Sequence, residues 1–376
     1  MRVLIDCSQI SRQKAGVGIY ALNLIKEIGK RKGNNTKFWL IVQDDDADFA
    51  QLADSFSLVR IPARLFRFLP LRLLMEQLYI PWIARRHKID VLHSLHYSLP
   101  LLPMRAQKIV TVHDLTSYIM PEVHTKTRLL YFRFFIRAAS RLANALIFVS
   151  QATSRDWNRY FPEFKGQCHV IPLGKSPKYR PDLEPREMEA AVHKYRLTKP
   201  YLLYIGTIEP RKNLTRLVEA FSRISEAFPT HQLVIAGMKG WMYEELFATI
   251  KTLKIDNKVV FTGFIDESDK PYLIGAAEAF IYPSLYEGFG IPVLEALACG
   301  TPTLTSNCSS LPEVAGDAAL LADPTDIDDL ASNIERLLAD TELRNLLREN
   351  SLKQAALFDW AYTADQTLCA YRSLAR

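Results

Sequence analysis

The sequence predicts an α/β protein with two doubly wound domains, and three observations lead to this fold class. Short apolar runs alternate with helical stretches along all 376 residues, which is the pattern of parallel sheets with helices on both faces. A hydrophobic content of 48% over that length is enough for two separate cores. The segment 173–200 is polar and irregular and contains four prolines, so we expect the domain boundary there.

The first half is expected to fold around short apolar strands joined by helices. The expected strands are 2–6, 37–42, 89–93, 108–112, 145–149 and 168–172. The expected helices are 17–32, 125–143 and 152–161. Ser150 precedes the last of these helices and is suited to cap it. The first strand follows Met1 without the long apolar core of a signal peptide.

The second half repeats the alternation with new elements. The expected strands are 200–205, 231–236, 258–262, 279–282 and 301–305. The expected helices are 213–228, 242–253, 268–277, 326–339 and 341–356. A last amphipathic helix, 358–374, lies too far along the chain to belong clearly to the second domain.

Cysteine use and hydropathy predict an intracellular protein. The five cysteines are odd in number and include no Cys-x-x-Cys pair, which argues against a disulfide framework or a zinc site and for a reducing cytosol. No apolar run approaches the ~20 residues that a membrane-spanning helix needs.

The net charge of +6 is unevenly distributed along the chain. Residues 1–173 carry 25 Lys and Arg against 13 Asp and Glu, a net charge of +12. Residues 174–376 carry 22 against 28, a net charge of −6. The first half is therefore suited to an anionic surface or partner, and the second half is not.

The most informative segment is bracketed by two glutamates, in Glu287-Gly-Phe-Gly-Ile-Pro-Val-Leu-Glu295. A proline just inside and a glycine just past the following stretch predict a short helix at the mouth of a Gly-rich loop. Backbone N–H groups freed by Gly288 and Gly290 are suited to bind a phosphate beside the helix N-terminus. Two carboxylates at such a site favour a ligand with hydroxyls and a diphosphate. A solvent-facing loop glutamate and a helix-surface glutamate are the alternative.

A second candidate phosphate site follows the expected strand 200–205, in Gly206-Thr-Ile-Glu-Pro-Arg-Lys-Asn213. Arg211 can donate to two phosphate oxygens at once, and Lys212 supplies a compact positive charge. An ordinary basic loop is an equal alternative. Gly16 and Gly18 similarly allow a ligand to approach the backbone, but a glycine pair often only forms a turn, and the full dinucleotide fingerprint is absent.

His113 follows the expected strand 108–112, at the sheet edge where ligands of open α/β folds bind. It can hydrogen-bond a sugar hydroxyl or stabilise charge at a reacting carbon, and a half-buried histidine satisfied by the backbone is an equal alternative. His93 and His96 have metal-like spacing, but they follow a strand and have no evident third ligand, so we expect no metal there. The acidic run 44–46 is expected to be a solvated loop.

Two stretches combine basic residues with large apolar ones. Residues 60–88 hold seven Lys and Arg against one acid, Glu76, with leucines and aromatic residues between them. Residues 126–137 repeat this composition. Such stretches suit the plane of an anionic membrane. Two helices that bury their apolar faces and expose their arginines would explain much of the same pattern.

Taken in order, these motifs resemble the retaining family-4 glycosyltransferases of the GT-B fold over nearly the whole chain. The resemblance extends to Val149-Ser150, Val170-Ile-Pro-Leu-Gly174, Gly263-Phe264 and Leu311-Pro-Glu-Val-Ala-Gly316. It implies two Rossmann-like domains that face each other across a cleft, with the C-terminal helix crossing back to the first domain. The first domain, which would bind the acceptor, would be 1–173 plus 358–376. The second, 174–357, would bind the nucleotide sugar.

The resemblance also implies roles for the motif residues. Glu287 would hold hydroxyls of the donor sugar, Glu295 the ribose, and His113 the sugar near the reacting carbon. Arg211 and Lys212 would neutralise the leaving diphosphate. Further donor contacts would come from Gly16, Gly18, Gly206, Gly288, Phe289, Gly290 and Ile291. The chain departs from the family at Thr207, where many members have arginine, and at Ala15, which replaces the first glycine of a pair.

The segment 206–213 looks most like that of bacterial mannosyltransferases of surface-polysaccharide synthesis. The implied reaction moves a hexose, with mannose favoured, from a nucleotide-diphosphate sugar such as GDP-mannose to a lipid-linked glycan. Retention, no metal, no cofactor and a peripheral position on the cytoplasmic face of the membrane are also implied. The alternatives are a UDP-sugar-dependent transferase, a GT-B nucleotide-sugar epimerase and a non-catalytic membrane scaffold. No nucleic-acid-binding module is recognised in the first half.

Overall fold

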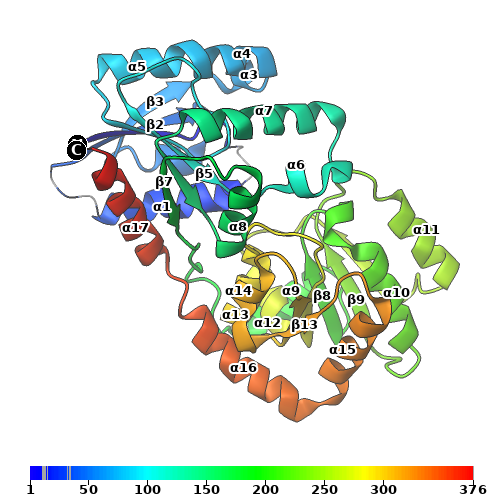
Figure 1. Cartoon of the computed structure of the whole chain (residues 1–376). Coiled ribbons are helices and arrows are strands. Elements are labelled where there is room, and N and C mark those ends of the chain that lie inside the picture. Colours follow the sequence, from blue (N-terminus) through cyan, green and yellow to red (C-terminus); the bar gives the residue numbers. More distant parts are fainter. Residues whose placement is uncertain (11–13, 15, 32, 34, 376) are drawn as a thin grey trace. The chain divides into compact units, whose positions relative to one another are not determined.

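The structure is a computed structural model that describes the whole chain except residues 11–13, 15, 32, 34 and 376. The chain forms two compact units (Figure 1). Unit 1 contains Met1–Gly174 and Asp359–Arg376, and unit 2 contains Lys175–Phe358. Two predicted positions lie outside the described residues. They are Ala15 of the first loop and position 32, where the first helix was expected to end.

Unit 1 is built on a parallel sheet with the strand order β3-β2-β1-β4-β5-β6-β7. The chain runs outward from β1 to β3, and then returns to place β4 on the other side of β1. The carboxyl ends of β1 and β4 therefore form the topological switch point, where open sheets of this kind bind ligands. The strands are β1 (Arg2–Asp6), β2 (Lys37–Gln43), β3 (Ser57–Ile61), β4 (Val91–Ser94), β5 (Gln107–Val112), β6 (Ala145–Phe148) and β7 (Gln167–Val170).

The helices of unit 1 connect these strands, and the last one comes from the far end of the chain. Ser150 caps α8 as predicted, because its Oγ accepts a hydrogen bond from the backbone N–H of Thr153 at 3.1 Å. The α-helices are α1 (Val17–Arg31), α2 (Ala47–Ala50), α3 (Ala63–Phe66), α4 (Leu69–Leu74), α5 (Ile80–Arg86), α6 (Thr116–Ile119), α7 (Lys126–Leu142), α8 (Gln151–Tyr160) and α17 (Trp360–Leu374). The π-helix η1 (Met75–Tyr79) and the 3₁₀ helix η2 (Pro121–Val123) complete the set.

Helix α17 is fixed to unit 1 by buried polar contacts as well as by packing against α1. The Tyr371 hydroxyl lies 2.6 Å from His93 Nδ1, and the Nε2 of the same histidine lies 2.8 Å from Thr111 Oγ1. At the start of the helix, Thr363 Oγ1 donates to the carbonyl of Pro172 at 2.7 Å. The predicted return of the C-terminal helix to the first domain is therefore confirmed.

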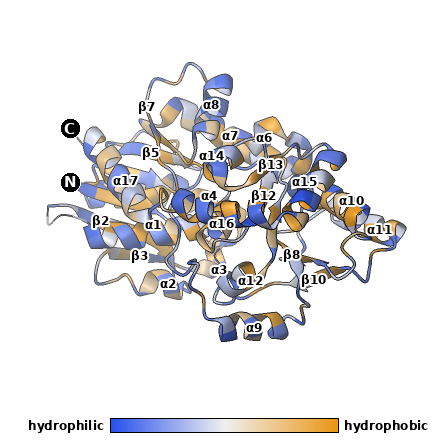
Figure 2. Ribbon diagram, turned by 90° about the horizontal axis from the view of Figure 1, so that it is seen from below, coloured by the Kyte–Doolittle hydropathy of each residue, from blue (hydrophilic) through white to orange (hydrophobic). Residues whose placement is uncertain are grey.

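Unit 2 repeats the plan with the parallel order β10-β9-β8-β11-β12-β13, and its switch point lies between β8 and β11. The strands are β8 (Tyr201–Ile205), β9 (Gln232–Ala236), β10 (Val259–Gly263), β11 (Ala279–Tyr282), β12 (Thr303–Ser306) and β13 (Leu320–Ala322). The helices are α9 (Pro185–Lys194), η3 (Pro210–Lys212), α10 (Leu214–Ile224), α11 (Glu244–Leu253), α12 (Lys270–Ala276), α13 (Ile291–Ala298), α14 (Leu311–Ala315), η4 (Gly316–Ala318), α15 (Ile327–Ala339) and α16 (Thr341–Ala355). Several of these helices, such as α9 and α10, alternate between hydrophilic and hydrophobic residues (Figure 2).

Several elements differ from the sequence-based expectation, among them the helices α2, α6, α9 and α14 and the strands β3 and β13. The segment 173–200 was expected to be irregular but contains α9, because Pro185 begins a helix at its first turn, where proline is tolerated. The strands β3 and β13 were not expected, and both lie at a sheet edge, where one neighbour is enough to hold a short strand. None of the described helices combines the length and the apolar character needed to span a bilayer.

Candidate functional site

Glu287 lies in the loop between β11 and α13, at the carboxyl end of a strand that borders the switch point of unit 2. Gly290 ends this loop as the N-cap of α13, with a φ of +107° that L residues rarely adopt. A Cβ on Gly290 would lie 2.7 Å from Leu311 Cδ2. The predicted Gly-rich loop and short helix are therefore present, and the backbone conformation favours glycine at this position.

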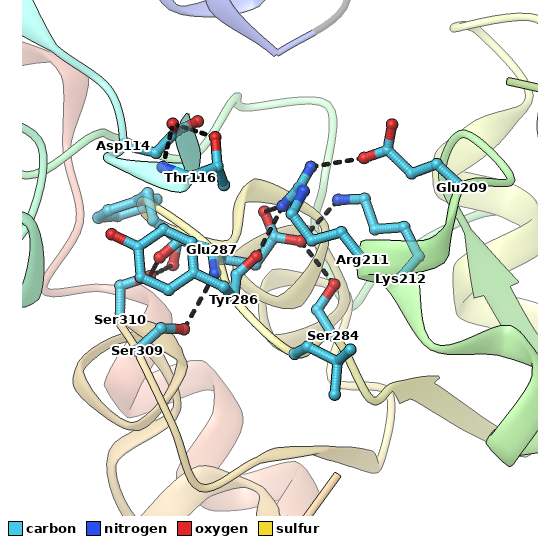
Figure 3. A network of polar contacts seen from close by, with 12 residues as sticks. Asp114, Thr116, Glu209, Arg211, Lys212, Ser284, Tyr286, Glu287, Ser309 and Ser310 are labelled. Carbon is cyan, nitrogen blue, oxygen red and sulfur yellow. Dashed lines mark hydrogen bonds and ion pairs between the residues drawn. The ribbon is translucent and has the colours of Figure 1, made fainter. Parts of the chain in front are cut away.

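The Glu287 carboxylate is buried and engaged by four side chains. Figure 3 shows three of them, Arg211, Lys212 and Ser284. Its Oε1 accepts from Lys212 Nζ at 2.6 Å, from Ser284 Oγ at 2.6 Å and from the Tyr282 hydroxyl at 3.1 Å. Its Oε2 lies 2.8 Å from Arg211 Nη1. Because three contacts fall on Oε1, Oε2 keeps the greater capacity to accept a hydrogen bond from a ligand hydroxyl.

Arg211 links this cluster to a second carboxylate. Its Nη2 donates to Glu209 Oε1 at 2.8 Å, and its Nη1 donates to the carbonyl of Tyr286 at 2.7 Å. Asn213 follows with a φ of +61°, and its Nδ2 donates to the carbonyls of Pro283 and Pro324. The basic loop after β8 is thus tied to the glutamate loop after β11, and Arg211, Lys212 and Glu287 come together. Sequence reasoning missed Glu209, although it lies within the motif.

Burial and pairing shift the pKa values of these groups in definite directions. Burial alone would raise the pKa of Glu287, but the charges of Arg211 and Lys212 lower it to about 2. Burial, together with the charge of Arg211, lowers the pKa of Lys212 from its usual value. Burial and the Glu287 charge raise the pKa of Tyr282 well above its usual value, so its hydroxyl stays protonated and can donate. Glu287 is therefore a fixed carboxylate at neutral pH.

Two serines hold the glutamate loop from the other side. Ser310 Oγ lies 2.9 Å from the carbonyl of Glu287 and 2.8 Å from that of Phe289, and the backbone N–H of Glu287 donates to Ser309 Oγ at 3.0 Å. Phe289 is buried against the ring of Phe358. Gly288 continues the same loop, and Ile291 opens α13. Both serines directly precede α14, a helix that the sequence did not predict, so no local signal marked them.

Glu295 lies in α13 in a buried cluster of its own. Its Oε2 is 3.1 Å from Lys270 Nζ, the ion pair that offsets its charge. Burial and the Glu295 charge raise the pKa of Tyr179 well above its usual value, and they raise that of Cys299 to about 12. Within the described residues, neither Glu295 Oε2 nor the Tyr179 hydroxyl has a hydrogen bond of good geometry. Both groups therefore keep bonding capacity, and Glu295 does not pair with Arg211 or Lys212.

Gly206 lies where the loops after β8 and β9 pack against each other. Its backbone N–H donates to the carbonyl of Ala236 at 2.9 Å, and that of Ile208 donates to Met238 at 2.9 Å. A Cβ on Gly237 would lie 2.0 Å from the Gly206 carbonyl oxygen. Gly206 thus leaves no room for a side chain on Gly237, a position that sequence reasoning did not single out.

His113 lies in unit 1, directly after β5. Its Nε2 donates to the carbonyl of Leu95 at 2.9 Å, and the rings of Tyr20 and Tyr97 pack edge-on against it. Burial lowers the pKa of His113, so the neutral imidazole is favoured. With the proton on Nε2, Nδ1 is an acceptor for a ligand hydroxyl. The backbone-satisfied alternative and the ligand-binding role are therefore compatible.

The two glycines of the first loop differ in their surroundings. Gly16 is exposed, with a φ of +44°, and a Cβ there would meet nothing within 4 Å. Gly18 is buried in the first turn of α1, where a Cβ would lie 3.2 Å from Lys14 Cδ. Gly16 thus leaves its backbone open to a ligand, whereas Gly18 permits close packing of the loop.

His93 and the acidic run have polar partners, whereas the His96 ring packs edge-on against Tyr97. His93 is held by α17 and β5 as described above, and burial lowers the pKa of His96 to about 3. The expectation of a solvated acidic loop is wrong for Asp46, which is buried, caps α2 and pairs with Lys14 Nζ at 2.5 Å. In the described part of the chain, no group of three or more His, Cys, Asp or Glu side chains is placed to share a metal ion.

Unit 1 contains a buried carboxyl group, Glu76, that the sequence marked only as the single acid of a basic stretch. Glu76 lies on η1 and is 1% exposed, and Gln9 Nε2 donates to its Oε1 at 2.7 Å. Burial, and next the charge of Asp6, raise its pKa to about 8, against the opposing charge of Arg72. Its Oε2 has no hydrogen-bond partner within the described residues. An isolated acid among basic residues was the only sequence signal for this group.

Protein families match both halves of the chain. The family described as "Glycosyltransferase Family 4" matches residues 15–178, and the one described as "Glycosyl transferases group 1" matches residues 185–354. The O-antigen chain mannosyltransferase B of Escherichia coli is 32% identical over 384 residues, which cover 100% of this chain and 100% of that protein.

Solved structures confirm the predicted GT-B fold. Sucrose-phosphate synthase from Thermosynechococcus elongatus gives a TM-score of 0.79 at 22% identity, over 99% of this chain and 98% of that one. HepE of Anabaena, in complex with UDP-glucose, gives 0.76 at 20% identity, over 99% of this chain and 100% of that one. With both halves matched by glycosyltransferase families and one glycosyltransferase similar along the full length, the chain belongs to the group 1, family-4 glycosyltransferases.

Proposed function

We propose that this glycosyltransferase moves a mannosyl residue from GDP-mannose to a hydroxyl of a lipid-linked glycan, in the synthesis of a cell-surface polysaccharide. The choice of mannose and of this type of acceptor rests on the full-length similarity to a protein named as an O-antigen chain mannosyltransferase. We further propose that the reaction retains the configuration of the sugar and requires neither a metal ion nor another cofactor.

The buried cluster of Glu287, Arg211 and Lys212 carries this proposal. Before a donor binds, the charges of this cluster and the neighbouring Glu209 balance. The carboxylates of Glu209 and Glu287 offset the cations of Arg211 and Lys212. A diphosphate would attract the two cations, while Oε2 of Glu287 would accept a hydrogen bond from a sugar hydroxyl. Cations held in place before the reaction stabilise the charge that develops on the leaving diphosphate.

His113 of unit 1 is assigned to the donor sugar near the reacting carbon, and Glu295 of unit 2 to the ribose. The Nδ1 of His113 would accept a hydrogen bond from the donor sugar, since its Nε2 already donates to Leu95. Retention follows in this proposal from attack on the same face that the diphosphate leaves, so that a diphosphate oxygen takes the proton of the acceptor hydroxyl. Glu295 is assigned to the ribose through its under-satisfied Oε2.

Membrane contact is proposed for the exposed apolar side chains of α3 to α5 and of α7. Leu74 and Leu78 are each 55% exposed, and Leu130 is 74% exposed. These side chains alternate with the basic residues of 60–88 and 126–137, a combination that favours an anionic bilayer surface. A lipid-linked acceptor would be reached from that surface.

Thermal unfolding with GDP, UDP, GDP-mannose and UDP-glucose tests the donor, because a ligand that binds the folded state raises its stability by mass action. We expect the GDP pair to raise the unfolding temperature more than the UDP pair, and the Arg211→Ala variant to lose most of this shift. Transfer from GDP-mannose to lipid-linked glycan extracts then tests the reaction. A larger shift with the UDP pair would overturn the donor, and donor conversion without any acceptor would favour an epimerase.

A further inference from the structure

A cavity of about 1220 Å³ lies at the amino edge of the unit 1 sheet, the edge opposite to His113. Its lining includes Arg2 at the start of β1, Asp90 just before β4, and Gln107 at the start of β5. These strands are neighbours in the sheet, so the cavity crosses the central part of that edge. Ligands of the expected reaction belong at the carboxyl edge, so a ligand of this cavity would be a different one.

The lining of this cavity is strongly cationic. It contains four basic residues, Arg2, Arg85, Lys88 and Arg105, and one acid, Asp90. Arg2 and Asp90 already make hydrogen bonds within the protein. Arg2 Nη1 donates to the carbonyl of His87 at 3.2 Å, and Asp90 accepts from the backbone N–H of Arg2 at 2.7 Å.

The other three cations, Arg85, Lys88 and Arg105, have neither an ion-pair partner nor a side-chain hydrogen bond within the described residues. All three are exposed at the cavity, so an anion that enters it can pair with them. The natural ligand for such a group is a phosphate.

Aromatic side chains at the same cavity indicate where that phosphate comes from. Trp82 lines the cavity, is 54% exposed and stacks on Tyr79 with ring centroids 5.6 Å apart. The guanidinium of Arg86 lies 5.7 Å from the Trp82 ring centroid. Exposed tryptophan and tyrosine favour the headgroup level of a bilayer, where one end is apolar and the other is wet. Leu78, one residue before Tyr79, extends this surface with an apolar side chain.

We propose that this cavity binds the phosphate of an anionic phospholipid headgroup, with Arg85, Lys88 and Arg105 around the phosphate and the Tyr79–Trp82 pair in the interface. The inference rests on the membrane contact proposed above, and it adds a defined lipid site to a general attraction. In this proposal the cavity anchors and orients the protein at the membrane where the glycan is assembled. The cavity takes no part in binding the donor or the acceptor.

Vesicle binding of the full-length protein tests the proposal with two matched triple variants. One removes the cavity cations, Arg85→Gln/Lys88→Gln/Arg105→Gln. The other removes the same charge from exposed residues outside the cavity, Arg60→Gln/Arg64→Gln/Lys126→Gln. Vesicles of phosphatidylcholine alone and with phosphatidylglycerol are compared by sedimentation. Both triples weaken the diffuse attraction to the anionic vesicles equally, so the cavity triple should lose at least about tenfold more affinity if phosphate hydrogen bonds are lost.

A soluble headgroup separates failure of this proposal from failure of membrane binding. sn-Glycerol 3-phosphate should raise the unfolding temperature of the wild-type protein and of the control triple, but not of the cavity triple. If glycerol phosphate gives that result but vesicles do not bind, the cavity is a phosphate site and both the lipid anchor and the membrane contact are overturned. Equal losses of vesicle affinity in the two triples would overturn the lipid site. So would stabilisation by inorganic phosphate that glycerol phosphate does not match.

Discussion

Arg211 is the residue whose removal best separates catalysis from folding. When Arg211 is lost, Glu287 keeps Lys212, Ser284 and Tyr282, but buried Glu209 loses its ion pair. Arg211→Ala should therefore lower the free energy of unfolding by about 2–3 kcal/mol. The rate of sugar transfer should fall by about 10²–10³, the usual loss when a charge that stabilises the transition state is removed. Initial rates and urea unfolding measure the two effects.

The matched control is Arg223→Ala, which removes an exposed cation of unit 2 that pairs with Asp328. It should leave the transfer rate unchanged. Lys212→Ala should also slow transfer, with a larger stability loss, because Lys212 is buried beside Glu287. A near-normal rate in a folded Arg211→Ala protein would contradict the assigned role.

Glu76 should make unit 1 less stable as the pH rises. Its folded pKa of about 8 lies above the unfolded value of 4.5, so its contribution is fully present below pH 4.5 and is lost as the pH rises towards 8. The full loss is on the order of 5 kcal/mol, since each of the roughly 3.5 pH units between the two pKa values is worth about 1.4 kcal/mol. Glu76→Gln mimics the protonated acid and should therefore stabilise the protein at pH 8 but not at pH 4.5.

Urea unfolding at both pH values measures this effect through tryptophan fluorescence, since four of the five tryptophans belong to unit 1. Glu287 lies in unit 2, so the opposite control, Glu287→Gln, is followed by calorimetry instead. The folded pKa of Glu287 is depressed to about 2, so its stabilisation is present above pH 4.5 and is lost below it. Identical pH profiles for wild type and Glu76→Gln would refute the prediction.

Sequence patterns predicted which charged residues come together in the candidate site better than they predicted the groups that position them. Arg211, Lys212 and Glu287 could be predicted because each follows a buried apolar strand in a loop that leads into a helix. Ser309 and Glu209 could not be assigned in the same way, because serine and glutamate are ordinary loop residues. Their roles depend on which two loops meet, which is a property of strand order and not of local sequence.

The meeting of the loops after β8 and β9 can be tested with a pair of glycine substitutions. Gly263→Ala should cost about 1–2 kcal/mol, because Gly263 has a φ of +70° but a Cβ there would meet nothing within 4 Å. Gly237→Ala should cost clearly more, because its Cβ would lie 2.0 Å from the backbone oxygen of Gly206. The backbone must then move, and the basic loop moves with it.

Urea unfolding and nucleotide affinity measure the consequences of this pair. The Gly237→Ala variant should lose both stability and nucleotide binding, whereas Gly263→Ala should keep its nucleotide affinity. Equal stability losses in the two variants would mean that the close approach at Gly206 is relieved without cost.

The fold class could be predicted because buried parallel strands are continuous apolar runs, and most of them were recognised. The edge strands β3 and β13 were not predicted because they are short and only partly buried. Helix α9 was not predicted because Pro185 was interpreted as a helix breaker, although it begins the helix. The bond between His93 and Tyr371 joins residues 278 positions apart, and no local pattern indicates such a pair.

That long-range bond makes unit 1 dependent on the end of the chain. Removal of residues 359–376 deletes α17, which buries Trp360, Leu368 and Tyr371, and it leaves His93 without its partner. We expect unit 1 to unfold in this truncated protein. Unit 2 ends at Phe358, so it should stay folded and keep its nucleotide-induced rise in unfolding temperature.

Tyr371→Phe is the milder version of the same test. It keeps the packing of α17 and removes only the hydroxyl that contacts buried His93, so the free energy of unfolding of unit 1 should fall by about 1–3 kcal/mol. Calorimetry with and without GDP distinguishes the units, because only the transition that GDP shifts belongs to unit 2. If the truncated protein kept both transitions, α17 would be an accessory of the first unit and not a part of its core.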